Sequence, residues 1–200
     1  REFLDRRGLY KYAEGELGPI YGHQIRYSGA KFPNKEGGID QLQYIENLLK
    51  TDPFSRRILW NLWNPSDLDK MALTPCHVMF QLYVTEMNGK MCLSGLITMR
   101  SNDYFLGNPF NLFSYYVLIR ILALKCNMVP HELIMNLGDV HIYSTHIKQI
   151  KEQIERPCKN LPKLRISDNI KIKDYSDISI DDFELIGYFP HPAIKGQMAI

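Results

Sequence analysis

The fold is organised around the stretch Met71-Ala-Leu-Thr-Pro-Cys-His-Val-Met-Phe-Gln-Leu-Tyr-Val84, because it joins a proline turn to a long apolar run. Residues 78–84 are mostly β-branched, aromatic or aliphatic, which predicts a strand. Proline fixes φ and lacks a backbone N–H, so we expect Pro75 to hold Cys76 at the mouth of that strand. Most free cysteines are buried and inert. A catalytic Cys76 therefore requires a cationic neighbour that lowers its pKa.

Composition limits the class of protein. The 200 residues are 45% hydrophobic, enough for one sizeable core, and we expect a single domain over residues 1–200. With 24 basic and 22 acidic side chains the net charge is +2, too small by itself to indicate a nucleic-acid or membrane partner. The apolar run 113–124 contains Arg120 and is shorter than a membrane span, so a soluble protein is expected.

The cysteines indicate a reducing compartment. They lie far apart and form no C-x-x-C pair: Cys76, Cys92, Cys126 and Cys158. Neither a metal site nor a disulfide framework is indicated, and we expect a cytoplasmic protein without a metal. The sequence opens on Arg1-Glu-Phe-Leu, without an initiator Met or a polar lead-in, which favours an N-terminally truncated piece of a longer chain.

Hydrophobic periodicity predicts an α+β fold with a mixed, mostly antiparallel sheet. Strands are expected over 78–86 and 91–100, joined by the hairpin signal Asn88-Gly89. Further strands are expected over 56–63, 132–143, 164–166 and 183–188, with a bulge at Gly138-Asp139. Helices are expected from Ile39 to Asp52-Pro53, from Pro109 to Leu124, and from residue 145 to Arg156. The helix after Pro109 is apolar over most of its circumference, so we expect it to be central and buried. A sheet face that these helices cannot cover would be buried by a second subunit.

Polar groups suited to a phosphorylated ligand lie at the ends of the expected strands. Arg56-Arg57 and Arg100-Ser101 offer forked guanidinium donors and a hydroxyl, which suit bidentate capture of an oxyanion. Arg100 is also the candidate cation that would raise the thiolate fraction of Cys76.

Two further segments carry groups that read a ligand. Asp103 is a loop carboxylate, Gly107 permits close approach of backbone to a ligand, and Asn111 has a donor and an acceptor on one side chain. His141 and Tyr143 lie two apart on an expected strand and so share a face. Without a ligand, the same residues would form the polar rim of an ordinary sheet.

These residues belong to a series of spaced motifs. In chain order they are Leu17-Gly-Pro-x-Tyr-Gly22, Asp52-Pro-x-x-Arg-Arg57, Trp63-Asn-Pro-x-Asp-Leu-x-x-Met-Ala-Leu73, Thr74-Pro-Cys-His77, Gln81-Leu-Tyr-Val84, Arg100-Ser-x-Asp103, Leu106-Gly-x-Pro-Phe-Asn111 with Tyr115, Gly138-Asp-x-His-Ile-Tyr143 with His146, and His191-Pro-x-Ile-Lys195 through Met198-Ala-Ile200. Together they resemble the thymidylate synthase family over essentially all 200 residues.

The resemblance implies the thymidylate synthase fold and reductive methylation of dUMP to dTMP. The co-substrate would be 5,10-methylenetetrahydrofolate, which gives both the one-carbon unit and the hydride. Cys76 would be the nucleophile that adds to C6 of the uracil, with Arg100, Asn111 and Tyr21 as the other catalytic residues.

The family's binding residues carry over by motif. The dUMP-binding set would be Arg56, Arg57, Arg100, Ser101, Asp103, Asn111, His141 and Tyr143. The folate-binding set would be Asp103, which faces the pterin, together with Gly107 and Ala199. Arg56 and Arg57 would reach the partner's site in a homodimer, and the C-terminal residues would close over the folate as a lid.

The chain also departs from the family pattern. Thr98-Met99 stands where the family commonly has Tyr-Gln. An upstream segment with a mobile arginine, a glutamate and a tryptophan is expected before Arg1, and a fused upstream domain such as a dihydrofolate reductase is left open. The 200 residues alone are therefore expected to bind nucleotide weakly and to turn over poorly or not at all.

Three other functions compete with this interpretation. A deoxycytidylate hydroxymethylase is disfavoured by Asn111, because a carboxylate suits the cytosine edge. A catalytically silent nucleotide-binding homologue is motivated by Thr98-Met99. A Cys76/His77 hydrolase is poor on geometry, because adjacent strand residues point to opposite faces.

Overall fold

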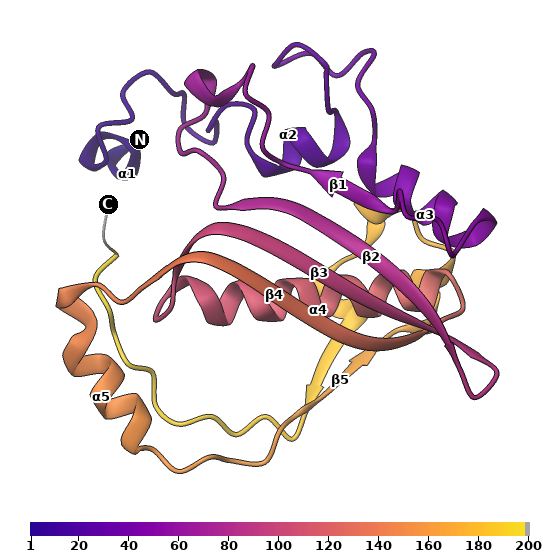
Figure 1. Cartoon of the computed structure of the whole chain (residues 1–200). Coiled ribbons are helices and arrows are strands. Elements are labelled where there is room, and N and C mark those ends of the chain that lie inside the picture. The colour runs from indigo at the N-terminus through magenta and orange to yellow at the C-terminus, as the bar shows by residue number, and fades with distance from the viewer. Residues whose placement is uncertain (199–200) are drawn as a thin grey trace.

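The computed structural model describes residues 1–198, without the side chain of Phe3. Its main sheet has the order β1 (Leu59–Asn61), β2 (His77–Met87), β3 (Lys90–Asp103) and β4 (Val129–His141) (Figure 1). β2 runs antiparallel to both β1 and β3, whereas β4 runs parallel to β3. A smaller antiparallel sheet pairs β5 (Lys163–Ile166) with β6 (Phe183–Ile186). The expected α+β fold with a mixed, mostly antiparallel sheet is confirmed.

The helices have the following bounds. The α-helices are α1 (Glu2–Arg6), α2 (Tyr21–Arg26), α3 (Gln41–Thr51), α4 (Gly107–Lys125) and α5 (Ile147–Glu155). The 3-10 turns are η1 (Leu68–Lys70), η2 (Ser144–His146), η3 (Asp168–Lys171), η4 (Tyr175–Asp177) and η5 (Ile180–Asp182). Helix α3 begins where the Asp40 carboxylate accepts the backbone N–H of Gln43, an N-cap. Among the described residues, no helix has the length and apolar character needed to cross a membrane.

The β2–β3 hairpin is set by its two-residue turn. Asn88 and Gly89 have φ values of 52° and 71°, as a type I′ turn requires. This turn pairs Met87 with Lys90 and so fixes the register of both strands. Phe80 and Leu82 on β2, together with Ile97 on β3, are consequently buried on the sheet face that α4 covers.

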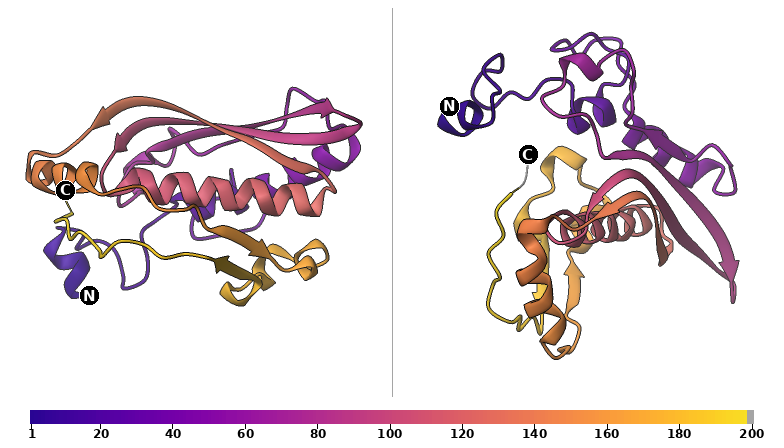
Figure 2. Two further views of the ribbon diagram at one scale, coloured as in Figure 1. Left: turned by 90° about the horizontal axis from the view of Figure 1, so that it is seen from below. Right: turned by 60° about the vertical axis from the view of Figure 1, so that its left-hand side comes forward.

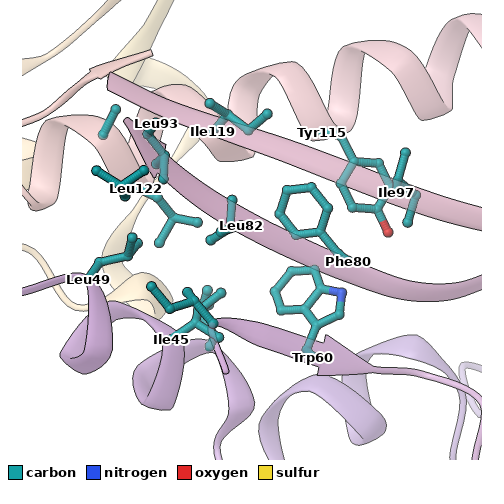
Figure 3. Packing of buried hydrophobic residues seen from close by; sticks show 14 of the residues in the cluster. Ile45, Leu49, Trp60, Phe80, Leu82, Leu93, Ile97, Tyr115, Ile119 and Leu122 are labelled. Carbon is teal, nitrogen blue, oxygen red and sulfur yellow. The ribbon is translucent and has the colours of Figure 1, made fainter. Parts of the chain in front are cut away.

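Helix α4 lies between the main sheet and the β5–β6 sheet (Figure 2). Its residues Tyr115, Ile119 and Leu122 meet the sheet in the core (Figure 3). Tyr115 lies beside Phe80, and Leu122 lies nearer to Leu93. The burial of α4 is one-sided: Phe110 is 77% exposed, and Phe113 is 47% exposed. Complete burial of this helix, which the sequence predicts, does not occur within the described residues.

The predicted bulge at Gly138-Asp139 is wrong. The β3–β4 register runs from Gly95 opposite Leu133 to Asp103 opposite His141 without a shift, and the irregularity lies between Leu93 and Gly95. Gly138 serves close packing instead, because a Cβ there would lie 2.9 Å from the carbonyl oxygen of Arg100.

Candidate functional site

The candidate site is built around residues 74–77, immediately before and at the start of β2. Cys76 is a free, half-buried cysteine, and its backbone N–H donates to the Tyr21 hydroxyl at 2.8 Å. Tyr21 is the first residue of α2, so this hydrogen bond joins two segments distant in sequence. Burial raises the pKa of Tyr21, although hydrogen bonding from Cys76 partly opposes it. The phenol therefore stays protonated and keeps a proton to donate.

Arg100 braces the same segment from β3. Its Nε donates to the Pro75 carbonyl at 2.8 Å, and its Nη2 donates to the Thr74 hydroxyl and carbonyl oxygens at 2.9 and 3.2 Å. Its backbone N–H donates to the carbonyl of Cys76 at 2.9 Å, and its guanidinium carbon lies 5.6 Å from the centre of the Trp63 ring. The structure thus puts an exposed cation beside the segment that carries the thiol.

Asn111 contacts His77, a contact that the sequence did not reveal. The Nδ2 of Asn111 lies 2.8 Å from Nε2 of His77, whose Nδ1 lies 3.1 Å from the Tyr115 hydroxyl. Burial lowers the pKa of His77, so its ring is neutral near pH 7. A neutral ring with its proton on Nδ1 accepts from Asn111 and donates to Tyr115. The available signal was the four-residue spacing of Asn111 and Tyr115, which puts both on one helix face.

Asp103 and Gly107 shape the turn that leads from β3 into α4. The Oδ1 of Asp103 accepts the backbone N–H groups of Phe105 and Leu106, each at 3.1 Å. A Cβ on Gly107 would lie 3.5 Å from both the Cβ of Asp103 and the Oδ1 of Asn111. The structure therefore brings Asp103, Gly107 and Asn111 together.

The end of β4 joins this group through its pairing with β3. Ser101 is paired with Asp139, and Asp103 is paired with His141. The His141 Nδ1 lies 2.9 Å from the Asp139 carboxylate. The rings of His141 and Tyr143 are 4.9 Å apart at 82°, an edge-to-face contact. The two side chains predicted to share a face do contact each other.

Comparison with known proteins identifies the family. The family model described as Thymidylate synthase matches residues 2–200. The chain belongs to the thymidylate synthase family. This assignment confirms the family recognised from the motifs, the enzyme class (a methyltransferase) and the reaction, methylation of dUMP to dTMP.

Named relatives of the thymidylate synthase family align with the whole chain. The chain is 45% identical to the thymidylate synthase of Saccharomyces cerevisiae and covers 68% of that protein. It is 42% identical to the human thymidylate synthase, of which it covers 64%. It is 46% identical to a bifunctional dihydrofolate reductase-thymidylate synthase of Paramecium tetraurelia, of which it covers 43%. A fused domain in this protein stays a prediction.

Two residues of the thymidylate synthase motifs lie apart from this cluster. Arg56 and Arg57 are exposed in the loop between α3 and β1, where they line a hollow of about 280 Å³ with Asp52, Phe54 and Ser55. No residue of the 74–77 segment lines that hollow. Ala199 lies outside the described residues.

Met99, which stands where the family commonly has Gln, is tightly packed. Met99 is buried and paired with His77 across β2 and β3. Its sulfur accepts from the amide of Asn102, which is also buried, at 3.6 Å. A soft apolar side chain thus fills the space beside the strand residue that contacts Asn111.

Proposed function

We propose that this chain methylates dUMP reductively, with Cys76 as the nucleophile and residues 74–77 as the floor of the nucleotide site. The proposal is supported by hydrogen bonds that reach this segment from separate elements. Tyr21 binds Cys76, Arg100 binds Pro75, and Asn111 binds His77. The co-substrate 5,10-methylenetetrahydrofolate supplies the one-carbon unit and the hydride. The family assignment supports the reaction class.

Cys76 adds through its thiolate to C6 of the uracil, which makes C5 nucleophilic toward the incoming carbon. Arg100 binds Thr74 and Pro75 and so fixes the segment that carries the thiol. With Ser101, which follows it on β3, Arg100 also holds the phosphate, because guanidinium groups bind oxyanions with a planar fork of donors. The phosphate anchor and the nucleophile are thus fixed to one segment, which limits how the nucleotide can lie.

Asn111 reads the uracil edge. Its Oδ1 accepts the N3–H of uracil, and the second hydrogen of its Nδ2 donates to O4, where negative charge develops after thiolate addition. Neutral His77 occupies the first hydrogen of that amide and so fixes its orientation. In cytosine, N3 is an acceptor and the exocyclic amine is a donor, the reverse of uracil at this edge. To match cytosine the Asn111 amide would have to flip, and its Oδ1 would then face Nε2 of His77, which would need the proton. This argues for uracil over the deoxycytidylate alternative.

The remaining polar residues complete the two ligand sites. His141 and Tyr143 hold the ribose 3′-hydroxyl. Asp103 faces the pterin with a carboxylate fixed by two backbone N–H groups, and the absence of a side chain at Gly107 keeps space beside it.

A second copy of this chain covers the outer face of the main sheet and brings Arg56 and Arg57 to the partner's phosphate site. That face is open in a single chain and carries exposed apolar side chains among polar ones: Tyr83 is 64% exposed, and Ile134 is 48% exposed. Both line a hollow of about 570 Å³ on the face opposite to α4. Exposed apolar surface of this kind is typical of an interface, and C2 pairing of one face with itself is the commonest arrangement.

Covalent trapping tests the proposal. The protein that carries these residues is incubated with 5-fluoro-dUMP and 5,10-methylenetetrahydrofolate and then analysed by peptide mass spectrometry. We expect an adduct on Cys76 that Cys76→Ala abolishes. Cys158→Ser, which changes an exposed thiol, should keep it. Absence of an adduct in the unmodified full-length protein that carries these residues, as a silent homologue predicts, would refute the proposal. In a parallel incubation with dCMP in place of 5-fluoro-dUMP, a hydroxymethylated dCMP product would instead establish the rival enzyme.

A further inference from the structure

His146 is a fully buried polar ring outside the site described above. It ends η2, is 0% exposed, and lies between the rings of Phe105 at 5.1 Å and Tyr143 at 5.8 Å. Its Nε2 lies 2.7 Å from the carbonyl oxygen of Gln197. A carbonyl can only accept, so Nε2 carries a proton and donates. The buried ring therefore makes a direct hydrogen bond to the C-terminal segment.

The other ring nitrogen argues against a purely space-filling role. Within the described residues, Nδ1 of His146 is buried and has no hydrogen-bond partner. Burying such an atom costs free energy that a phenylalanine or leucine would avoid. Among residues 1–198, this ring's hydrogen bond is the one to the carbonyl of Gln197. The hydrogen bond to the Gln197 carbonyl therefore explains why a histidine occupies this position.

The C-terminal segment is fitted closely at the same place. A Cβ on Gly196 would lie 2.7 Å from Cε1 of Phe105, 3.1 Å from Cδ2 of Leu106 and 3.4 Å from Nε2 of His146. One residue earlier, the Gln149 side chain donates to the carbonyl of Lys195 at 3.3 Å. The chain here runs beside α5 (Figure 1). It therefore rests on Phe105 and Leu106, the two residues that the Asp103 carboxylate fixes.

We infer that His146 is the latch of the C-terminal segment: its Nε2–H holds the carbonyl of Gln197 and so seats residues 195–198 on Phe105 and Leu106, next to the folate site. His146 is a positioning residue, since it acts on the folate site through the segment. The inference rests on the proposed function for its kinetic consequence. The seating of the segment itself can be measured without turnover.

The test compares two substitutions that differ in one donor. His146→Phe keeps a flat ring and removes the hydrogen bond, whereas His146→Gln supplies an amide Nε2 that can donate in its place. For His146→Phe we expect faster amide exchange in the C-terminal peptide and roughly tenfold lower kcat/KM for the folate, as loss of one hydrogen bond implies. Affinity for dUMP should change less than twofold. His146→Gln should recover much of both losses.

Gly196→Ala provides an independent route, because its added methyl clashes mainly with Phe105 and Leu106 and leaves the His146 side chain unsubstituted. It should reproduce the fast exchange and the folate defect even where His146→Phe fails to fold. Gln149→Ala, which removes a longer contact, should have a smaller effect. Unchanged C-terminal exchange in both His146→Phe and Gly196→Ala would overturn the latch. Equal loss of dUMP and folate affinity without rescue by His146→Gln would also overturn it. Failure of the proposed function appears separately, as the absence of the Cys76 adduct in the unmodified chain.

Discussion

Replacing Tyr21 by phenylalanine removes one oxygen from the site and leaves the ring contact with His77, at 5.0 Å, in place. The backbone N–H of Cys76 then loses its 2.8 Å acceptor. An orphaned N–H in a partly buried position costs about 1–2 kcal/mol. If the whole of this cost adds to the activation free energy because the sulfur is misplaced, kcat falls roughly 5- to 30-fold. Dihydrofolate release under saturating substrates measures kcat, and the rate of 5-fluoro-dUMP trapping measures thiol addition alone.

Tyr12→Phe is a matched control, because it deletes a buried phenol away from residues 74–77. The Tyr12 hydroxyl donates to the Lys70 carbonyl at 2.9 Å, and the side chain is 6% exposed. We expect both variants to lose about 1 kcal/mol of unfolding free energy, measured by urea titration. Only Tyr21→Phe should slow trapping. Equal trapping rates in Tyr21→Phe and the unmodified chain would refute the role of the phenol in placing Cys76.

Three further predictions follow from the same contacts. Because burial holds the pKa of His77 below 6.5, the unfolded chain takes up a proton there at a higher pH than the folded chain does, so stability falls as the pH drops below about 6.5. The urea midpoints at pH 7.5 and 5.5 should therefore differ less in His77→Gln than in the unmodified chain. An identical difference in both proteins would contradict this prediction. Arg100→Lys keeps the charge but loses the forked guanidinium that donates to both Thr74 and Pro75, so dUMP affinity measured by calorimetry should weaken roughly tenfold or more. The control Arg165→Lys, an exposed substitution on β5, should not alter this affinity. Ile134→Asp puts a charge on the outer sheet face, and sedimentation should show a monomer with an unchanged circular dichroism spectrum; a persisting dimer would exclude that face as the interface.

The local elements were readable from sequence because their signals are local. Asn88-Gly89 specified its hairpin, and Asp52-Pro53 marked the end of the helix α3, which stops at Thr51. The parallel pairing of β4 with β3 has no such local signal, because the choice of sheet edge depends on the crossover made by α4. The contact of His77 with Asn111 spans 34 residues and appears only once that crossover is in place. The motifs identified the set of site residues, while the physical bonds among them required the fold.

The backbone of residues 74–77 shows why a proline precedes the cysteine. This segment leads into β2, where the ladder that would satisfy its polar groups is only beginning. Pro75 has no N–H to satisfy, and its carbonyl takes the Nε of Arg100. The N–H of Cys76 goes to Tyr21, and its carbonyl takes the N–H of Arg100. The polar backbone groups of both residues are therefore paired before any ligand arrives. These backbone bonds hold Cys76 in position and do not involve its sulfur. The thiol is therefore placed for attack before a ligand binds.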